Sequence, residues 1–493
     1  MAPARNHEAL LWSIVAVPLG ALLLTWPALY SGYPLLYPDS MTYLEDGRPV
    51  ARALFLHRFS DYYGMRSFIY SLGILPWHWN VSPVPIVALN ALLAAFVIWL
   101  VTRSVLPRRT GLLYLILLGL LSLLTSLSWF VSLIMPDILG PLLYLCIYLV
   151  VFARETLTRA EHMSVAVLAW WAVASHATHL ILAAGVCVLL ALLLALRFRP
   201  MRGRWRAVGE VSCIVLIAVV SQVALHAYLN GEPSLNGERP PFLTARLIAD
   251  GPGRWYLEQS CPAANLVVCD FIRELPHETD AFLWGDDSIL QKAGPEGAKR
   301  MRDEEAGFAL ATLRTYPREQ LSSSAANFWQ QLTAFGLWDL GPNGWVPQVF
   351  DHALPGQLRR YLESRQARDV LPLDLFTSVH NWTVIAALVI AGVCAPLSWR
   401  WRRPRLAGLS VVIAFTVVAN ALVTGALSSV EDRYEARVIW LVPLLAGLLL
   451  FDLLINRGRV QLGTIMEALR LRNAHPIPNG SGHCRILLVL WRS

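Results

Sequence analysis

Charged residues stand directly beside apolar runs at three places in this sequence. Asp39 follows the first apolar run in YPDSMTYLED, Asp137 interrupts another in SLIMPDILGP, and Arg433 precedes the last one in SVEDRYEARVIW. Ionisable residues at such positions are costly and are functional candidates by default. A guanidinium binds a phosphate through two parallel hydrogen bonds, and a carboxylate holds a polar substrate or a metal ion. These residue types therefore predict a site for a polar, phosphate-bearing substrate.

Further candidates surround these three places. Arg66 in YYGMRSFIY stands near apolar sequence, and His176 and His179 in ASHATHL share one helical face because they are three residues apart. We expect these residues to contact an anionic group. Surface salt bridges for the arginines and hydrogen-bonded packing for the histidines are the alternatives. Tyr434, next to Arg433, is a further candidate for phosphate binding, and the secondary candidates are Tyr43, Arg246, Glu431 and Asp432.

The acidic residues are not equivalent. Asp137 is the sole acid between Gly111 and Phe152, and it follows Pro136 at a predicted helix start. N-capping at the positive end of the helix dipole is therefore an alternative to substrate or metal binding. We expect the remaining acids beside the apolar runs to face solvent, namely Glu45, Asp46 and Glu435.

The elements that must position these residues are membrane-spanning helices. The chain has 493 residues, of which 56% are hydrophobic and 15% charged, and its mean hydropathy is +0.48. Such a composition excludes an ordinary soluble protein, and runs near the ~20 residues of a transmembrane helix exclude the short alternating strands of a barrel. About ten spans are predicted, at 9–30, 83–105, 111–131, 138–153, 163–177, 179–197, 208–228, 380–399, 406–427 and 437–455.

Arginine-rich connections alternate with connections that carry the candidate residues. The net charge is +7, and arginines cluster near 103–109, 154–159, 197–206, 400–405 and 457–459. The positive-inside rule places these connections in the cytoplasm and accounts for the basic charge without nucleic acid. The loop 31–82, with amphipathic helices, and the segment 229–379 then lie outside.

The chain divides into four predicted parts. Residues 1–228 hold helices one to seven, residues 229–379 form a soluble α or α/β domain outside the membrane, residues 380–456 hold helices eight to ten, and residues 457–493 form a cytoplasmic tail. Cys261 and Cys269 in CPAANLVVC are predicted to form a disulfide in an oxidising outer compartment, and two free thiols are the alternative.

This arrangement resembles the GT-C superfamily of integral-membrane glycosyltransferases. The similar features are Asp39 in the first outer loop, the stretch GMRSFIYSLGILPWHW, Asp137 in MPDIL, the late outer domain, and the Arg433–Tyr434 pair before a final apolar helix. The layout looks closer to the aminoarabinose, mannosyl and arabinofuranosyl transferases than to the oligosaccharyltransferases. The paired acid of some relatives is absent, because Ser40 follows Asp39.

The resemblance implies transfer of a sugar from a polyprenyl-phosphate donor to a periplasmic glycan or lipid acceptor at a bacterial inner membrane. It implies Asp39 as the general base, Arg66, His176, His179 and Arg433 as phosphate ligands, Asp137 as a residue that orients the acceptor or a divalent ion, and Tyr434 beside the lipid phosphate. No cofactor is certain; Asp39 and Asp137 would hold a divalent cation if one binds. A transporter or flippase, and a polymerase or ligase of lipid-linked glycans, are the alternatives.

Overall fold

The computed structural model describes residues 3–60, 66–107, 110–235, 237–400 and 403–455, and the predicted tail 457–493 lies outside this range. Within it the chain is helical, and its one isolated β-bridge joins Leu35 to Leu133. The first half contains α1 (Pro3–Leu24), α2 (Trp26–Ser31), α3 (Pro38–Leu56), α4 (Phe68–His78), α5 (Val84–Val105), α6 (Thr110–Leu124), α7 (Leu127–Ser132), η1 (Pro136–Ile138), α8 (Leu139–Phe152), η2 (Arg154–Thr156), α9 (Arg159–Ala174), α10 (Ala177–Ala195), η3 (Arg199–Met201) and α11 (Trp205–Asn230).

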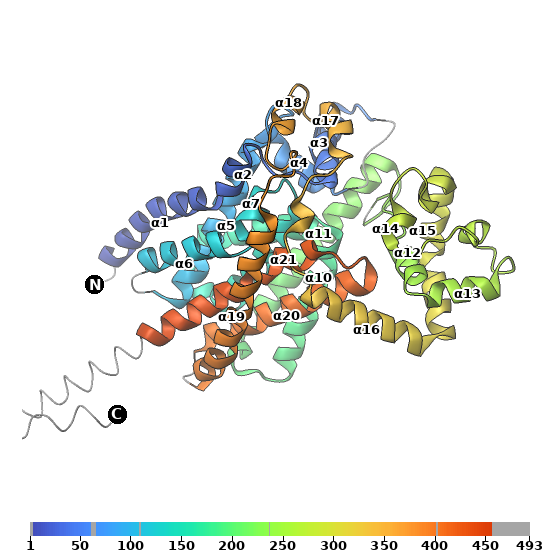
Figure 1. Cartoon of the computed structure of the whole chain (residues 1–493). Helices are drawn as coiled ribbons and strands as arrows, with labels where there is room; N and C mark the ends of the chain where they lie inside the picture. Colours follow the sequence, from blue (N-terminus) through green and yellow to red (C-terminus); the bar gives the residue numbers. More distant parts are fainter. Residues whose placement is uncertain (1–2, 61–65, 108–109, 236, 401–402, 456–493) are drawn as a thin grey trace, which may run out of the picture.

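In the second half, the helices between residues 242 and 362 precede three apolar segments that begin at Leu373, Pro404 and Asp432 (Figure 1). These elements are α12 (Phe242–Ala249), α13 (Pro252–Ser260), η4 (Val267–Phe271), α14 (Thr279–Leu283), α15 (Ile289–Thr315), α16 (Pro317–Thr333), η5 (Trp338–Leu340), α17 (Val346–Ala353), α18 (Leu358–Leu362), α19 (Leu373–Arg400), α20 (Pro404–Leu427) and α21 (Asp432–Ile439).

The protein is a polytopic helical membrane protein. Seven helices in the described residues are long and apolar enough to cross a membrane: Ile14–Ser31, Val84–Val105, Ala177–Ala195, Trp205–Asn230, Leu373–Pro396, Pro404–Leu427 and Asp432–Ile455. The other three predicted spans are helices too, but α6, α8 and α9 have 15, 14 and 16 residues. All ten predicted segments are therefore helical, and seven of them meet the length of a span.

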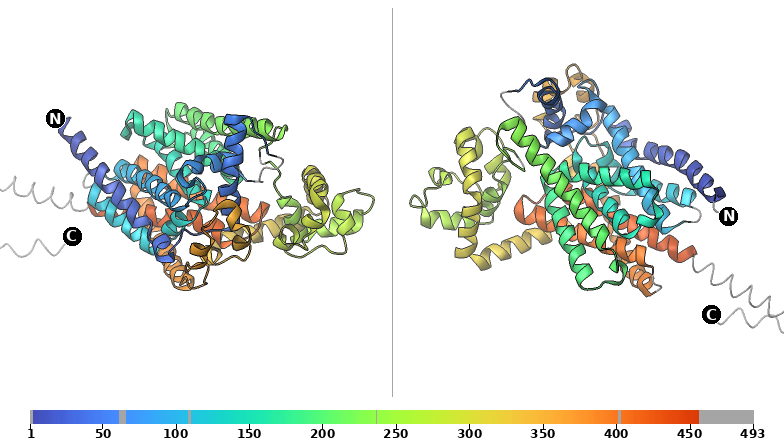
Figure 2. Two further views of the ribbon diagram at one scale, coloured as in Figure 1. Left: turned by 90° about the horizontal axis from the view of Figure 1, so that it is seen from above. Right: turned by 180° about the vertical axis from the view of Figure 1, so that it is seen from behind.

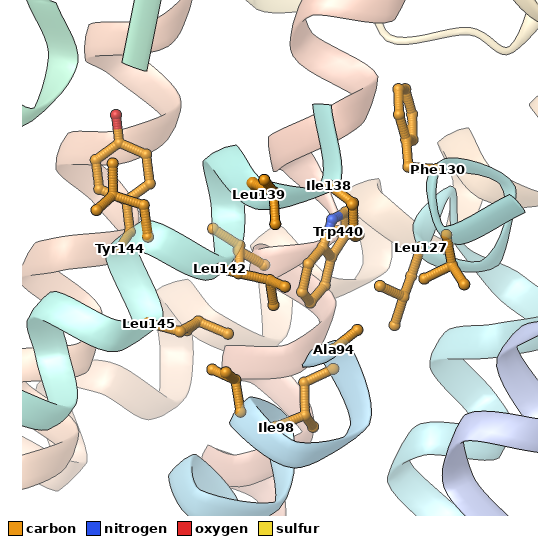
Figure 3. Packing of buried hydrophobic residues seen from close by; sticks show 14 of the residues in the cluster. Ala94, Ile98, Leu127, Phe130, Ile138, Leu139, Leu142, Tyr144, Leu145 and Trp440 are labelled. Carbon is orange, nitrogen blue, oxygen red and sulfur yellow. The ribbon is translucent and has the colours of Figure 1, made fainter. Parts of the chain in front are cut away.

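Helix α8 forms the centre of the bundle. Every residue from Leu139 to Phe152 is buried, which is the pattern of a helix surrounded by others on all sides. Figure 3 shows Trp440 packed among Leu142, Ala94 and Leu127 near the start of α8. The central helix thus has one end fixed beside the final apolar helix.

The basic connections meet at the other end of α8. Arg103 donates to Glu161 over 2.7 and 2.8 Å, and Arg405 donates to the Ser104 carbonyl over 2.8 Å. Arg204 donates to the Val151 carbonyl over 2.6 Å, one residue before α8 ends. Four connections that the sequence assigns to one side of the membrane therefore contact one another.

The segment between α11 and α19 contains a unit with its own core. Residues of α12 to α15 form a separate hydrophobic cluster that includes Leu257, Phe282 and Phe308. In the views of Figures 1 and 2 this unit projects from the bundle on the side away from the N-terminus. Cys261 and Cys269, the predicted disulfide partners, are bonded to each other within it.

Helix α16 connects this unit to the bundle by packing along α20. A Cβ on Gly425 of α20 would lie 2.7 Å from the backbone oxygen of Asn327, so the two helices approach closely only because residue 425 has no side chain. Helix α16 also contacts the inserted unit: Asp250, which directly follows α12, accepts hydrogen bonds from Gln320 (2.9 Å) and Asn327 (2.8 Å) of α16.

Candidate functional site

The centre of the candidate site is a carboxylate shared by two arginines. Oδ1 of Asp137, in η1, lies 3.5 Å from Nη1 of Arg433 and 3.5 Å from Nη1 of Arg437. The side chains of Asp137, Arg433 and Arg437 are 1%, 6% and 1% exposed. Because Arg433 and Arg437 are four residues apart on α21, their side chains leave the helix on one face and reach the same acid.

A polar network extends from this centre into the bundle. Arg437 donates to Oδ1 of Asn420 over 3.1 Å, and the amide nitrogen of Asn420 donates to Glu435 over 2.8 Å. Glu435 is fully buried. The prediction that Glu435 faces solvent is therefore wrong, because an arginine and an asparagine inside the bundle compensate for the lost water.

The final helix begins earlier than the sequence predicts, because the charged residues of its first turns hide it from a search for apolar runs. It starts at Asp432 instead of 437, so that Arg433, Glu435 and Arg437 are helical residues. Charge lowers local hydropathy, but buried and paired charges do not end a helix.

A second ion pair lies at the start of the outer loop. Nη2 of Arg66 donates to Oδ1 of Asp39 over 2.5 Å, and the two side chains are 17% and 16% exposed. Asp39 occupies the first turn of α3 after Pro38. Arg433 interacts electrostatically with Asp39 as well as with Asp137, and Arg66 interacts with Arg433 and Tyr434. The structure therefore brings Asp39, Arg66, Asp137 and Arg433 into one cluster from four distant segments.

Three tyrosines line this cluster. The guanidinium carbon of Arg433 lies 4.0 Å from the ring centroid of Tyr37 and 5.0 Å from that of Tyr434. Tyr43 is buried and interacts electrostatically with Asp39, Arg66 and Asp137. Burial raises the pKa of Tyr37 to about 12 although Arg433 acts in the opposite direction, so its phenol is neutral at physiological pH.

The two histidines lie beside the arginines of the cluster. Nδ1 of His176 accepts the backbone N–H of Thr178 over 3.2 Å and so caps α10, while Nδ1 of His179 lies 2.9 Å from the Ala172 carbonyl. Burial, followed by the positive field of His179, Arg437, Arg66 and Arg433, lowers the pKa of His176 well below its ordinary value. His176 would therefore contact an anion through a neutral N–H group and not through a positive charge.

The segment around η5 holds the start of α21 in place. Gln331 exchanges two hydrogen bonds with the backbone of Glu431, of 2.8 and 3.0 Å. Asp339 accepts the backbone N–H of Arg433 over 2.8 Å, and Asp432 accepts that of Gly336 over 2.9 Å. Arg433 is thus positioned by residues that lie about a hundred positions earlier in the chain.

Some predicted residues lie elsewhere. Nε of Arg246 lies 2.8 Å from Oδ1 of Asp250. Asp250 also accepts hydrogen bonds from α16, so Arg246 belongs to the contact between the inserted unit and α16 and does not lie at the anion site. Glu45 is exposed as predicted, whereas Asp46 is only 7% exposed, so the prediction of a solvent-facing Asp46 is wrong.

The sequence reasoning missed Arg437, Asn420, Tyr37 and Asp339. A usable signal existed for Arg437, because it follows Arg433 by four residues and so shares its helical face. Asn420 and Asp339 carry no local signal, since their partners are distant in the sequence.

The carboxylates of the cluster do not fit a divalent cation in this arrangement. Asp39 and Asp137 already face guanidinium groups, which a metal ion would have to displace. Across the described residues no group of three or more His, Cys, Asp and Glu side chains is arranged to hold a metal ion. We therefore derive no chemical step through a metal.

The cluster is instead suited to an anion. Three guanidiniums, of Arg66, Arg433 and Arg437, face the carboxylates of Asp39 and Asp137, and His176 adds an N–H donor without charge. The Nδ1–H group of His179 is directed at the Ala172 carbonyl, so His179 was wrongly predicted to donate to an anion. Nε of Arg433 is buried without a hydrogen-bond partner in the described structure. Buried donors of this kind are normally paired, and an anion would accept the hydrogen bond of this N–H group.

Comparisons of the chain with protein-family models, curated proteins and solved structures find no match. Its chemistry must therefore be argued from the cluster itself.

Proposed function

We propose that the protein is a membrane glycosyltransferase of the GT-C type, which moves a sugar from a polyprenyl-phosphate donor to a hydroxyl group of a periplasmic glycan or lipid acceptor. The observation that carries the proposal is the buried guanidinium of Arg433, whose Nε has no hydrogen-bond partner within the described residues and which lies beside the guanidiniums of Arg66 and Arg437. A lipid phosphate would accept a hydrogen bond from this group, and its bilayer-embedded chain would lie along the apolar helices.

The position of the cluster along the bundle agrees with this proposal. Asp137 precedes α8, and the basic connections gather where α8 ends, so the two sets of charges lie at opposite ends of one helix. Following the positive-inside rule, we propose that the basic end is cytoplasmic and that the cluster faces the periplasm at a bacterial inner membrane.

The reaction needs two kinds of group. The bond between the anomeric carbon and the phosphate oxygen breaks, and the charge on the leaving polyprenyl phosphate is stabilised by Arg433, with Arg66 and the N–H of His176 beside it. The bond from the acceptor oxygen to the anomeric carbon forms, and the hydroxyl proton passes to a carboxylate. Asp39 is the acid that the family resemblance assigns to this step, while Asp137 holds Arg433 and Arg437 in place.

Donor binding tests the proposal directly. The purified protein in nanodiscs is incubated with a polyprenyl phosphate that carries a labelled sugar, and binding, hydrolysis and transfer to a lipid or glycan acceptor are measured. We expect Arg433→Met to weaken donor binding about 10- to 100-fold, the value of a desolvated charged hydrogen bond, and Arg433→Lys to recover only part of it. The matched control is Arg359→Met, because that side chain is 91% exposed and forms an exposed ion pair with Glu363. Donor affinity unchanged in Arg433→Met would refute the phosphate site.

A transporter or flippase of a lipid-linked solute is the second candidate. The observation in its favour is that Arg437, Asn420 and Glu435 form a buried polar network inside membrane-spanning helices, which is where transporters place such groups. Movement of the labelled lipid across a proteoliposome bilayer, without cleavage of its sugar–phosphate bond, would favour this candidate. Elongation of a lipid-linked glycan in the same assay would indicate the related polymerase or ligase reaction.

A further inference from the structure

The carboxylates around Arg433 differ in whether they already have a strong partner. Each of the following accepts a hydrogen bond or ion pair from the protein: Asp39 from Arg66, Asp137 from Arg433 and Arg437, Glu435 from Asn420, Asp339 from the backbone of Arg433, and Asp432 from the backbone of Gly336. A carboxylate paired with a guanidinium is a weak base, because taking up a proton would break the pair.

Glu431 differs from these residues in that its side-chain hydrogen bond comes from a neutral hydroxyl group, that of Ser429. It is the N-cap residue of α21, two residues before Arg433, and its backbone is fixed by Gln331 on both its N–H and its carbonyl. Its side chain is partly exposed, hydrogen-bonds Ser429, and forms no ion pair with a described residue. The backbone of Glu431 is thus held by two hydrogen bonds, while its side chain remains partly accessible to a ligand.

The charged groups that face Glu431 come from three elements. Asp339 of η5 and Asp280 of α14 present carboxylates, and Arg433 of α21 presents a guanidinium. Burial first, and then Asp339 and Asp280, raise the pKa of Glu431 to about 7, although Ser429 and Arg433 act in the opposite direction. A group with such a pKa is half ionised near neutral pH, where a proton acceptor is most effective.

We propose that Glu431 accepts the proton of the acceptor hydroxyl, while Asp39 positions Arg66. This inference rests on the proposed function. The acceptor oxygen bonds to the anomeric carbon, its hydroxyl proton moves to an oxygen of Glu431, and the electron pair of the broken bond leaves with the polyprenyl phosphate. The proton returns to water when product departs, so the carboxylate is regenerated for the next cycle.

The proposal also gives the acceptor a direction of approach. Asp280 and Asp339 belong to the segment inserted between α11 and α19, so Glu431 faces that segment, whereas Asp39 and Arg66 belong to the first outer loop and interact with Arg433. The acceptor would then enter beside the inserted segment, and the donor phosphate would lie between Arg433 and Arg66.

The test is the pH dependence of sugar transfer by Glu431→Gln. In the wild type we expect kcat/KM to rise with pH up to about 7 and then to level off. Glu431→Gln should lower it by at least about 100-fold and remove the rise. Asp280→Asn should keep activity and move the rise to lower pH, which a merely structural residue would not do. The matched control is Glu363→Gln, an exposed carboxylate that pairs with Arg359.

A second readout does not need activity. Infrared difference spectra between acidic and basic pH should show a carboxyl group that titrates near neutral pH in the wild type and is absent in Glu431→Gln. A wild type that transfers sugar while Glu431→Gln keeps its rate and pH profile would overturn this inference and leave the proposed function standing. A wild type that binds no lipid phosphate and transfers no sugar would overturn both.

Discussion

Replacement of Asp137 by asparagine removes one charge and keeps the shape of the side chain. The substitution leaves Arg433 and Arg437 facing each other without their shared acid, in a place where all three side chains are at most 6% exposed. Removing one partner from a buried ion pair typically costs about 3–5 kcal/mol, because the remaining charge stays buried without compensation.

The structure favours the lower end of that range. Both ion pairs are long, at 3.5 Å, Arg437 keeps its hydrogen bond to Asn420, and Arg433 keeps its contact with the ring of Tyr37. We therefore expect Asp137→Asn to lower the free energy of unfolding by about 3 kcal/mol. The assay is denaturant titration of the purified protein in mild detergent, followed by circular dichroism.

Glu363→Gln provides the matched control. Glu363 pairs with Arg359 at 3.0 Å, a shorter contact than those of Asp137, but its side chain is 54% exposed. An exposed pair of this kind contributes at most about 0.5 kcal/mol. If burial decides the cost, Asp137→Asn is far more damaging than Glu363→Gln; equal effects would refute the reasoning and show that water reaches Asp137.

Two further substitutions test the packing and the inserted unit. Gly425→Ala places a Cβ 2.7 Å from the backbone oxygen of Asn327 and should cost about 1–3 kcal/mol, measured against Gly119→Ala, where a Cβ meets no atom within 4 Å. Replacing Cys261 and Cys269 by serine should destabilise the inserted unit by about 2–4 kcal/mol and speed its proteolysis, while the bundle stays intact. A proteolysis rate equal to that of the wild type would contradict a stabilising disulfide.

The helical fold could be predicted from sequence because its determinants are local. Each apolar run is a continuous stretch, and each arginine cluster lies next to the run that it orients. The contact of Arg405 with the carbonyl of Ser104 shows the same agreement in three dimensions. The length of a helix depends also on distant contacts. Helix α8 has only 14 residues, and the helices around it bury every one of them.

Four residues of the site could be predicted from the sequence, but the residues with which they pair could not. Asp39, Arg66, Asp137 and Arg433 stand out because they are charged beside apolar sequence, and the structure gathers them. Their partners do not stand out, since Asp137 and Arg437 are 300 residues apart in the chain. The same distance explains the wrong prediction for Glu435: a residue whose compensation comes from another helix looks solvent-facing when it is read alone.

The energetics of the cluster argue that it serves a ligand and not the fold. A buried ion pair seldom stabilises a protein more than apolar residues of the same volume would, and the neighbouring helix α8 is packed entirely with buried side chains and needs no charges to hold it. Nε of Arg433 is buried and unpaired within the described structure. An oxygen of a phosphate ligand would accept the hydrogen bond of this N–H group, so the proposed ligand would complete the hydrogen bonding of the guanidinium.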